Sequence, residues 1–96
     1  LESLGKEGIL INVARGSVID QDALIHFLKN KLILAAGLDV YTNEPNIPKE
    51  LVSLDNTVLL PHIASGTVET RNAMGQLVYD NIENFFKGKN LISPVV

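Results

Sequence analysis

Three short apolar runs, none of which alternates with polar residues, limit what this chain can fold into. They cover residues 8–14, 32–40 and 57–60 and are rich in Ile, Leu and Val. A strand that is apolar on both faces is typical of a parallel sheet covered on both sides. Each run is therefore predicted to form a buried strand.

The segments between these runs are long enough for parallel crossovers. After the first run, Asp20 can cap a helix, and an apolar stripe at helical spacing follows it: Ala23, Leu24, Phe27 and Leu28. This strand–helix–strand unit should be right-handed, with its two strands parallel. Residues 41–56 form a polar connection to the third run, with one helical turn expected at 49–53.

The last third of the chain predicts a long helix over residues 67–87, with Ser65 or Thr67 as its cap and Gly88 at its end. Its apolar face suits packing against a core or an interface and consists of Met74, Leu77, Val78, Ile82, Phe85 and Phe86. Residues 90–96 are expected to be extended.

Composition excludes several functional classes. Eight Lys and Arg against eleven Asp and Glu give a net charge of −3, so no basic stripe exists for nucleic acid. No apolar run is long enough to span a membrane. The absence of Cys excludes thiolate metal sites, and no metal is expected. A cytoplasmic location is compatible with the missing disulfides.

Charged side chains follow each predicted strand. Arg15 follows the first, Asp39 ends the second and His62 follows the third, while Glu44 lies five residues beyond Asp39. Because parallel strands present their carboxyl ends at one edge of a sheet, these side chains should emerge into one crevice.

An Arg, a Glu and a His in one crevice can bind a 2-keto acid and protonate its carbonyl oxygen while another group delivers hydride. Arginine holds a carboxylate with two hydrogen bonds, and histidine exchanges protons near neutral pH. Taken singly, Arg15 also fits a surface charge, His62 a turn, and Asp39 and Glu44 solvated loop carboxylates. The spacing alone leaves both interpretations open.

Three segments together resemble the D-isomer-specific 2-hydroxyacid dehydrogenase family. They are residues 12–20 (NVARGSVID), 36–45 (AGLDVYTNEP) and 61–67 (PHIASGT), the last followed by Glu69 and Arg71. They occur in the family's order and at its spacing, and they span most of the chain.

The resemblance implies a role for each strand-end residue. Arg15 would bind the substrate carboxylate and polarise the keto group, and His62 would be the acid in reduction and the base in oxidation. Glu44 would orient the His62 ring and favour its protonated form. A Glu at this position, rather than Gln, argues against the related formate dehydrogenases.

The resemblance also implies a cofactor, NAD or NADP. Asp39 would contact its nicotinamide end, and the other residues expected beside it are Val13, Ala14, Arg15, His62, Ala64 and Ser65. No G-x-G-x-x-G motif is present, so the pyrophosphate-binding turn would lie upstream.

The fold class implied is α/β, the C-terminal part of a Rossmann-type doubly wound parallel sheet. Residues 1–62 would complete the cofactor domain, and residues 63–96 would form a linking helix and tail that pack on a substrate domain. The parent is expected to be a homodimer. A chain carrying only this part should expose apolar surface, associate with itself or other chains, and be inactive.

Two functions remain open on sequence grounds. The first is reduction of a small 2-keto acid, with the tail and residues 45–54 most similar to the glyoxylate and hydroxypyruvate reductase branch. The second is partner binding without catalysis, as in the corepressors of the same superfamily, which keep the Arg, Glu and His. A serine hydrolase is not supported, because no G-x-S-x-G motif is present.

Overall fold

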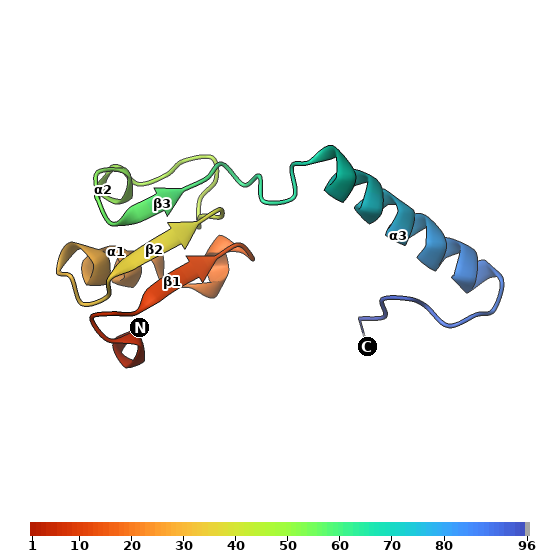
Figure 1. The fold of residues 1–96 in the computed structure, drawn as a ribbon, viewed down its shortest axis with the longest axis horizontal. Coiled ribbons are helices and arrows are strands. Elements are labelled where there is room, and N and C mark those ends of the chain that lie inside the picture. The colour runs from red at the N-terminus through yellow and green to blue at the C-terminus, as the bar shows by residue number, and fades with distance from the viewer. Residues whose placement is uncertain (96) are drawn as a thin grey trace. The chain divides into compact units, whose positions relative to one another are not determined.

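The computed structural model describes residues 1–95 and divides into two compact units, Leu1–Ala64 and Ser65–Val96. The first unit contains a parallel sheet of the strands β1 (Ile9–Asn12), β2 (Ala35–Leu38) and β3 (Thr57–Leu59) in that order. The strands run in the same direction in Figure 1. The predicted parallel α/β arrangement is therefore confirmed.

The strands are shorter than the apolar runs that predicted them. The second run begins at residue 32, but the amide of Leu32 donates to the carbonyl of Phe27 at 2.8 Å and so closes the preceding helix. Pairing across the sheet aligns Asn12 with Leu38 and Leu38 with Leu59. The carboxyl ends of all three strands thus lie at the same edge.

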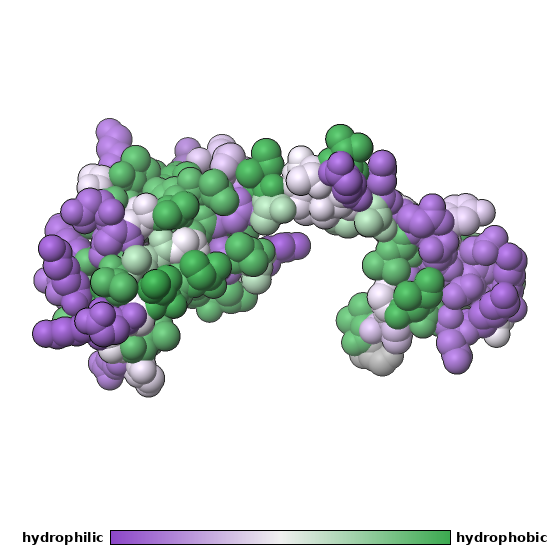
Figure 2. Space-filling view, in the orientation of Figure 1, coloured by the Kyte–Doolittle hydropathy of each residue, from purple (hydrophilic) through white to green (hydrophobic). Residues whose placement is uncertain are grey.

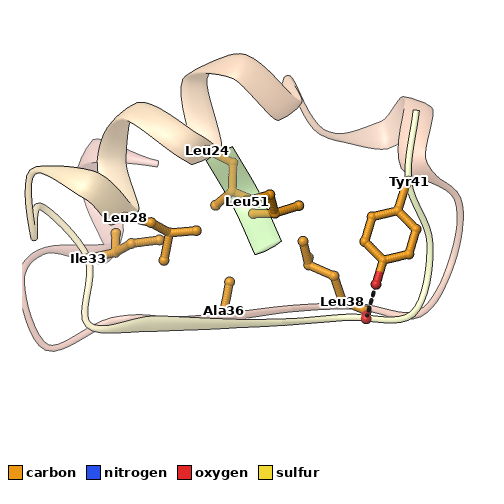
Figure 3. Packing of buried hydrophobic residues seen from close by; sticks show 7 residues of the cluster. All are labelled: Leu24, Leu28, Ile33, Ala36, Leu38, Tyr41 and Leu51. Atoms are coloured by element: carbon orange, nitrogen blue, oxygen red, sulfur yellow. Dashed lines mark hydrogen bonds between the residues drawn. The ribbon is translucent and has the colours of Figure 1, made fainter. Parts of the chain in front are cut away.

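One face of the sheet is covered by two helices, α1 (Gln21–Lys29) and α2 (Lys49–Val52). The Asp20 carboxylate accepts from the amide of Ala23 at 3.0 Å, which confirms the predicted cap of α1. Figure 3 shows the buried core between helices and sheet, which consists of Leu24, Leu28, Ile33, Ala36, Leu38, Tyr41 and Leu51. Two single 3-10 turns, η1 (Glu2–Leu4) and η2 (Gly16–Val18), flank β1.

The opposite face of the sheet is uncovered within residues 1–64. Its exposed apolar side chains are Ile9, Ile11, Val13, Val58 and Leu60, and apolar surface is widespread on the first unit in Figure 2. The continuous apolarity of the runs predicted that both faces of the sheet are covered. In residues 1–64, helices cover only one face. A strand that is apolar on both sides needs two covering layers.

The second unit consists of the helix α3 (Val68–Phe86) and the tail after it. The Thr67 hydroxyl caps α3 by accepting from the amide of Thr70 at 3.1 Å, so Thr67 rather than Ser65 is the cap. Gly88 follows the helix with a φ of 64° and fits the predicted helix end. The Asn81 side chain binds the tail at Ile92 and Ser93. Within residues 1–95, no helix combines the length and the apolarity needed to cross a bilayer.

Candidate active site

The parallel register brings three loops to one edge of the sheet. The amide of Asp39 donates to the carbonyl of Asn12 at 3.0 Å, and the amide of Leu60 donates to the carbonyl of Leu38 at 2.8 Å. These bonds extend the ladder one residue beyond the ends of β2 and β3. The segments bearing Arg15 and His62 therefore start from the same carboxyl edge, on either side of β2, and open α/β sheets bind ligands at that edge.

The Glu44 side chain reaches the His62 ring. Oε2 of Glu44 lies 2.7 Å from Nδ1 of His62, while Oε1 of Glu44 accepts from the amide of Tyr41 at 2.9 Å. The hydrogen bond with His62 is the main cause of a lowered pKa for Glu44, and the Tyr41 amide adds to it. Glu44 is thus held as a carboxylate, and it fixes the ring nitrogen that faces it.

The backbone that carries His62 has an unusual conformation. His62 has a φ of 55°, in the left-handed region that costs a residue with a Cβ about 1 kcal/mol. The Asp39 carboxylate accepts from the next two amides, Ile63 and Ala64, both at 2.8 Å. These two bonds hold the backbone immediately after His62 in place.

Asp39 is buried, with 2% of its surface exposed. The hydrogen bond from the Ile63 amide is the main cause of its lowered pKa, and it outweighs burial, which acts in the opposite direction. Both carboxylate oxygens are engaged by the protein's own backbone. The geometry therefore favours a role in holding the His62 turn, whereas direct contact with a cofactor remains a prediction.

The Arg15 loop is held close to the loop that leads to Glu44. A Cβ added at Gly16 would lie 2.0 Å from the carbonyl carbon of Tyr41 and 2.4 Å from the amide nitrogen of Thr42. Gly16 is therefore needed where two backbones touch. The Arg15 side chain is exposed, and its Nη1 donates to the carbonyl of Ala14 at 2.6 Å.

The other residues proposed for a cofactor occupy different settings. Val13 is 60% exposed directly after β1, and the amides of Ala14 and Ala64 are held by side chains of the first unit. Ser65 is the first residue of the second unit, so its role stays a prediction. Among the described residues, no group of three or more His, Asp or Glu is placed to hold a metal ion.

Sequence reasoning missed Tyr41. Its amide holds Glu44, and its hydroxyl donates to the carbonyls of Leu38 at 3.2 Å and Leu60 at 2.8 Å. It thereby joins the ends of β2 and β3 beneath the site, and Figure 3 shows the bond to Leu38. Burial raises the pKa of Tyr41, so the hydroxyl stays a donor. An aromatic residue just after the second strand, in an otherwise polar connection, was the available signal.

Comparison with known proteins identifies the family. The family model described as "D-isomer specific 2-hydroxyacid dehydrogenase, NAD binding domain" matches residues 1–64, two thirds of the chain. The chain belongs to the D-isomer specific 2-hydroxyacid dehydrogenase family. The resemblance seen in the sequence is therefore confirmed.

Several relatives in this dehydrogenase family are similar along the whole chain. Glyoxylate/hydroxypyruvate reductase A HPR2 of Arabidopsis thaliana is 51% identical over 96 residues, and 2-ketogluconate reductase of Gluconobacter oxydans is 53% identical over 96 residues. The chain spans 31% of the length of each of these relatives. It therefore corresponds to less than a third of a protein of their size.

A solved dehydrogenase structure has the same fold. The NADPH-dependent glyoxylate/hydroxypyruvate reductase of Sinorhizobium meliloti, in complex with NADP and malonate, superposes with a TM-score of 0.84 at 50% identity. The match covers 99% of this chain and 30% of that one. The fold class expected from sequence, part of a Rossmann-type sheet, is thus supported by a structure of the same family.

Proposed function

We propose that this chain is the C-terminal part of an NAD(P)-dependent reductase that converts a small 2-keto acid into the D-2-hydroxy acid. The observation that carries the proposal is the 2.7 Å pair of His62 and Glu44, on the sheet edge from which the Arg15 loop also starts. This set can hold a carboxylate and exchange one proton, which is what such a reduction needs from the protein.

Each side chain has one task in the proposed reaction. Arg15 binds the substrate carboxylate through its fork of donors. Nδ1 of His62 faces Glu44, so Nε2 is the nitrogen left to give a proton to the keto oxygen. In the reverse direction, Nε2 takes the hydroxyl proton. The lowered pKa of Glu44 keeps this partner charged throughout.

NAD or NADP would supply or accept the hydride at the substrate carbon. The first unit fits the nicotinamide end in two respects: Val13 offers exposed apolar surface at the carboxyl edge, and the Asp39 carboxylate uses two of its roughly four acceptor positions. The residues proposed to lie beside it are Val13, Ala14, Arg15, Asp39, His62, Ala64 and Ser65. The pyrophosphate-binding turn is proposed to lie outside these 96 residues.

The domain assignment also remains a proposal. Residues 1–62 would belong to the cofactor domain, and residues 63–96 would pack on the substrate domain. The family match and the compact first unit support the first part of this assignment, since both cover residues 1–64.

Glyoxylate and hydroxypyruvate are the proposed substrates, because proteins similar to this chain carry those names. We also propose a homodimer in the cytoplasm.

The test is turnover by the full-length protein that contains this chain. NADH or NADPH oxidation should be followed with glyoxylate, hydroxypyruvate and pyruvate, and the configuration of the product determined. Loss of turnover in His62→Ala and in Arg15→Ala would support the assigned roles. No oxidation with any keto acid would contradict the proposal and favour the partner-binding alternative.

A further inference from the structure

Asn12 is the polar residue inside the first apolar run, and both polar atoms of its side chain are hydrogen-bonded. It lies at the end of β1 with 5% of its surface exposed. Its Oδ1 accepts from the amide of Ala14 at 3.1 Å, and its Nδ2 donates to the carbonyl of Arg15 at 3.0 Å. A buried amide is costly unless its groups are hydrogen-bonded, and these two bonds close the turn after the strand.

The turn that Asn12 closes is anchored to the sheet. The carbonyl of Asn12 accepts from the amide of Asp39, which ties this point of β1 to β2 and thus to the residue that holds the His62 turn. Asn12 therefore joins the sheet edge, through its main-chain carbonyl, to the peptide of Arg15, through its side chain.

The backbone of the loop that carries Arg15 is held on both sides of this residue. Its own backbone is extended, with φ −147° and ψ 146°, and its exposed guanidinium bonds to the carbonyl of Ala14. The contact of Gly16 with Tyr41 fixes the far side of the loop, and the Asn12 bonds fix the near side. A long side chain that must meet a carboxylate with two donors needs its backbone held at both sides.

We propose that Asn12 is a positioning residue that sets the direction from which Arg15 meets the substrate carboxylate. The inference rests on the proposed function, because it assumes that Arg15 binds that carboxylate. Asn12 acts through the Arg15 peptide and touches no reacting atom itself.

The informative substitution is Asn12→Asp in the full-length protein. A carboxylate has the same shape and still accepts from the Ala14 amide, but it cannot donate to the Arg15 carbonyl and places two acceptors against each other. Affinity should be measured by calorimetry with oxamate, an unreactive analogue of a 2-keto acid, in the presence of reduced cofactor. The expected result is binding weakened about tenfold or more, with kcat/KM lowered by about 10- to 100-fold.

Asn56 provides a matched control. Its Nδ2 donates to the carbonyls of Leu28 and Leu34, both at 3.2 Å, just before β3 and so at the amino end of the strands, away from the candidate site. Asn56→Asp makes the same chemical change and breaks the same kind of bond. It should leave the oxamate affinity within about twofold of wild type, because Asn56 lies at the end of the strands opposite to Arg15. A loss as large as that in Asn12→Asp would point to a general loosening of the sheet.

A double variant separates positioning from a merely structural effect. Arg15→Lys keeps the charge but loses the rigid fork, so the direction of the side chain matters less. In that background, Asn12→Asp should change the oxamate affinity by less than about twofold. An unchanged affinity in Asn12→Asp alone, or the same loss with and without Arg15→Lys, would overturn the proposal.

A second variant covers the case in which Asn12→Asp does not fold. Asn12→Ser is uncharged and can accept from the Ala14 amide, but its shorter side chain does not reach the Arg15 carbonyl. It should weaken oxamate binding in the same way, and wild-type affinity would count against the role of Asn12. Turnover by wild type with unaffected Asn12 variants would remove this inference and leave the proposed function intact, whereas no wild-type turnover would remove the function itself.

Discussion

Nδ1 of His62 and Oε2 of Glu44 lie 2.7 Å apart, although the two residues are eighteen positions apart along the chain. The pair depends on the Tyr41 amide, which holds the other oxygen of Glu44, and on the Asp39 carboxylate, which holds the backbone after His62. Glu44 thus orients the His62 ring directly, and Asp39 orients it through the backbone that carries it. The contributions of these two supports can be tested separately.

Replacing Glu44 by Gln should lower kcat in the full-length protein and leave the KM for the keto acid nearly unchanged. The amide keeps a hydrogen-bond partner for Nδ1 but removes the negative charge beside the ring that gives up the proton, while Arg15 still binds the substrate carboxylate. The loss should be smaller than the about 10²- to 10⁴-fold expected for His62→Ala. Steady-state kinetics checks this, and an increase in KM with unchanged kcat would speak against a role for Glu44 in proton transfer.

Replacing Asp39 by Asn should also lower kcat, with the dissociation constant of the cofactor changed much less. An amide offers one acceptor where the carboxylate held two amides, so the left-handed turn at His62 loosens. Fluorescence titration with NADPH measures cofactor binding apart from chemistry. If the cofactor affinity collapses while the kcat at saturation is kept, Asp39 acts through its proposed contact with the cofactor, and its role in holding the His62 turn is wrong.

The sequence placed Arg15, Asp39 and His62 correctly at one edge of the sheet because that placement follows from strand direction alone. Uninterrupted apolar runs and long connections favour parallel strands, and parallel strands share a carboxyl edge. The cap at Asp20 was predictable for a similar reason, since its partner amide lies three residues away. Features that depend on local sequence or on strand topology could therefore be predicted.

Features that depend on the approach of distant backbones were not predictable. The contact of Gly16 with Tyr41, the φ of 55° at His62 and the bond of the Tyr41 hydroxyl to Leu60 join loops that only the folded sheet brings together. The uncovered sheet face had no local signal in the strands, and it was expected only because the family resemblance implied that this chain carries part of the fold. Apolarity of a strand shows that a face must be buried, but not whether the same 96 residues bury it.

Stability should fall in acid partly because of the two carboxylates at the site. The pKa values of Glu44 and Asp39 lie below their ordinary values of 4.5 and 3.8. Their contribution to the free energy of unfolding is therefore present above these ordinary values and is lost as pH falls through the lowered ones. In urea unfolding, wild type should exceed Glu44→Gln in stability at pH 7, and the difference should shrink below about pH 4. A difference independent of pH would show that the charge is not the cause.

Replacing Gly16 by Ala should damage both the fold and the site. The new Cβ would meet the carbonyl of Tyr41 at 2.0 Å, a distance that forces one of the two loops to move. Overpacking of this kind costs about 1–3 kcal/mol, and the movement also shifts Arg15 relative to Glu44, so kcat/KM should fall with the melting temperature. Equal melting temperatures for Gly16→Ala and wild type would mean that the two loops do not pack as described.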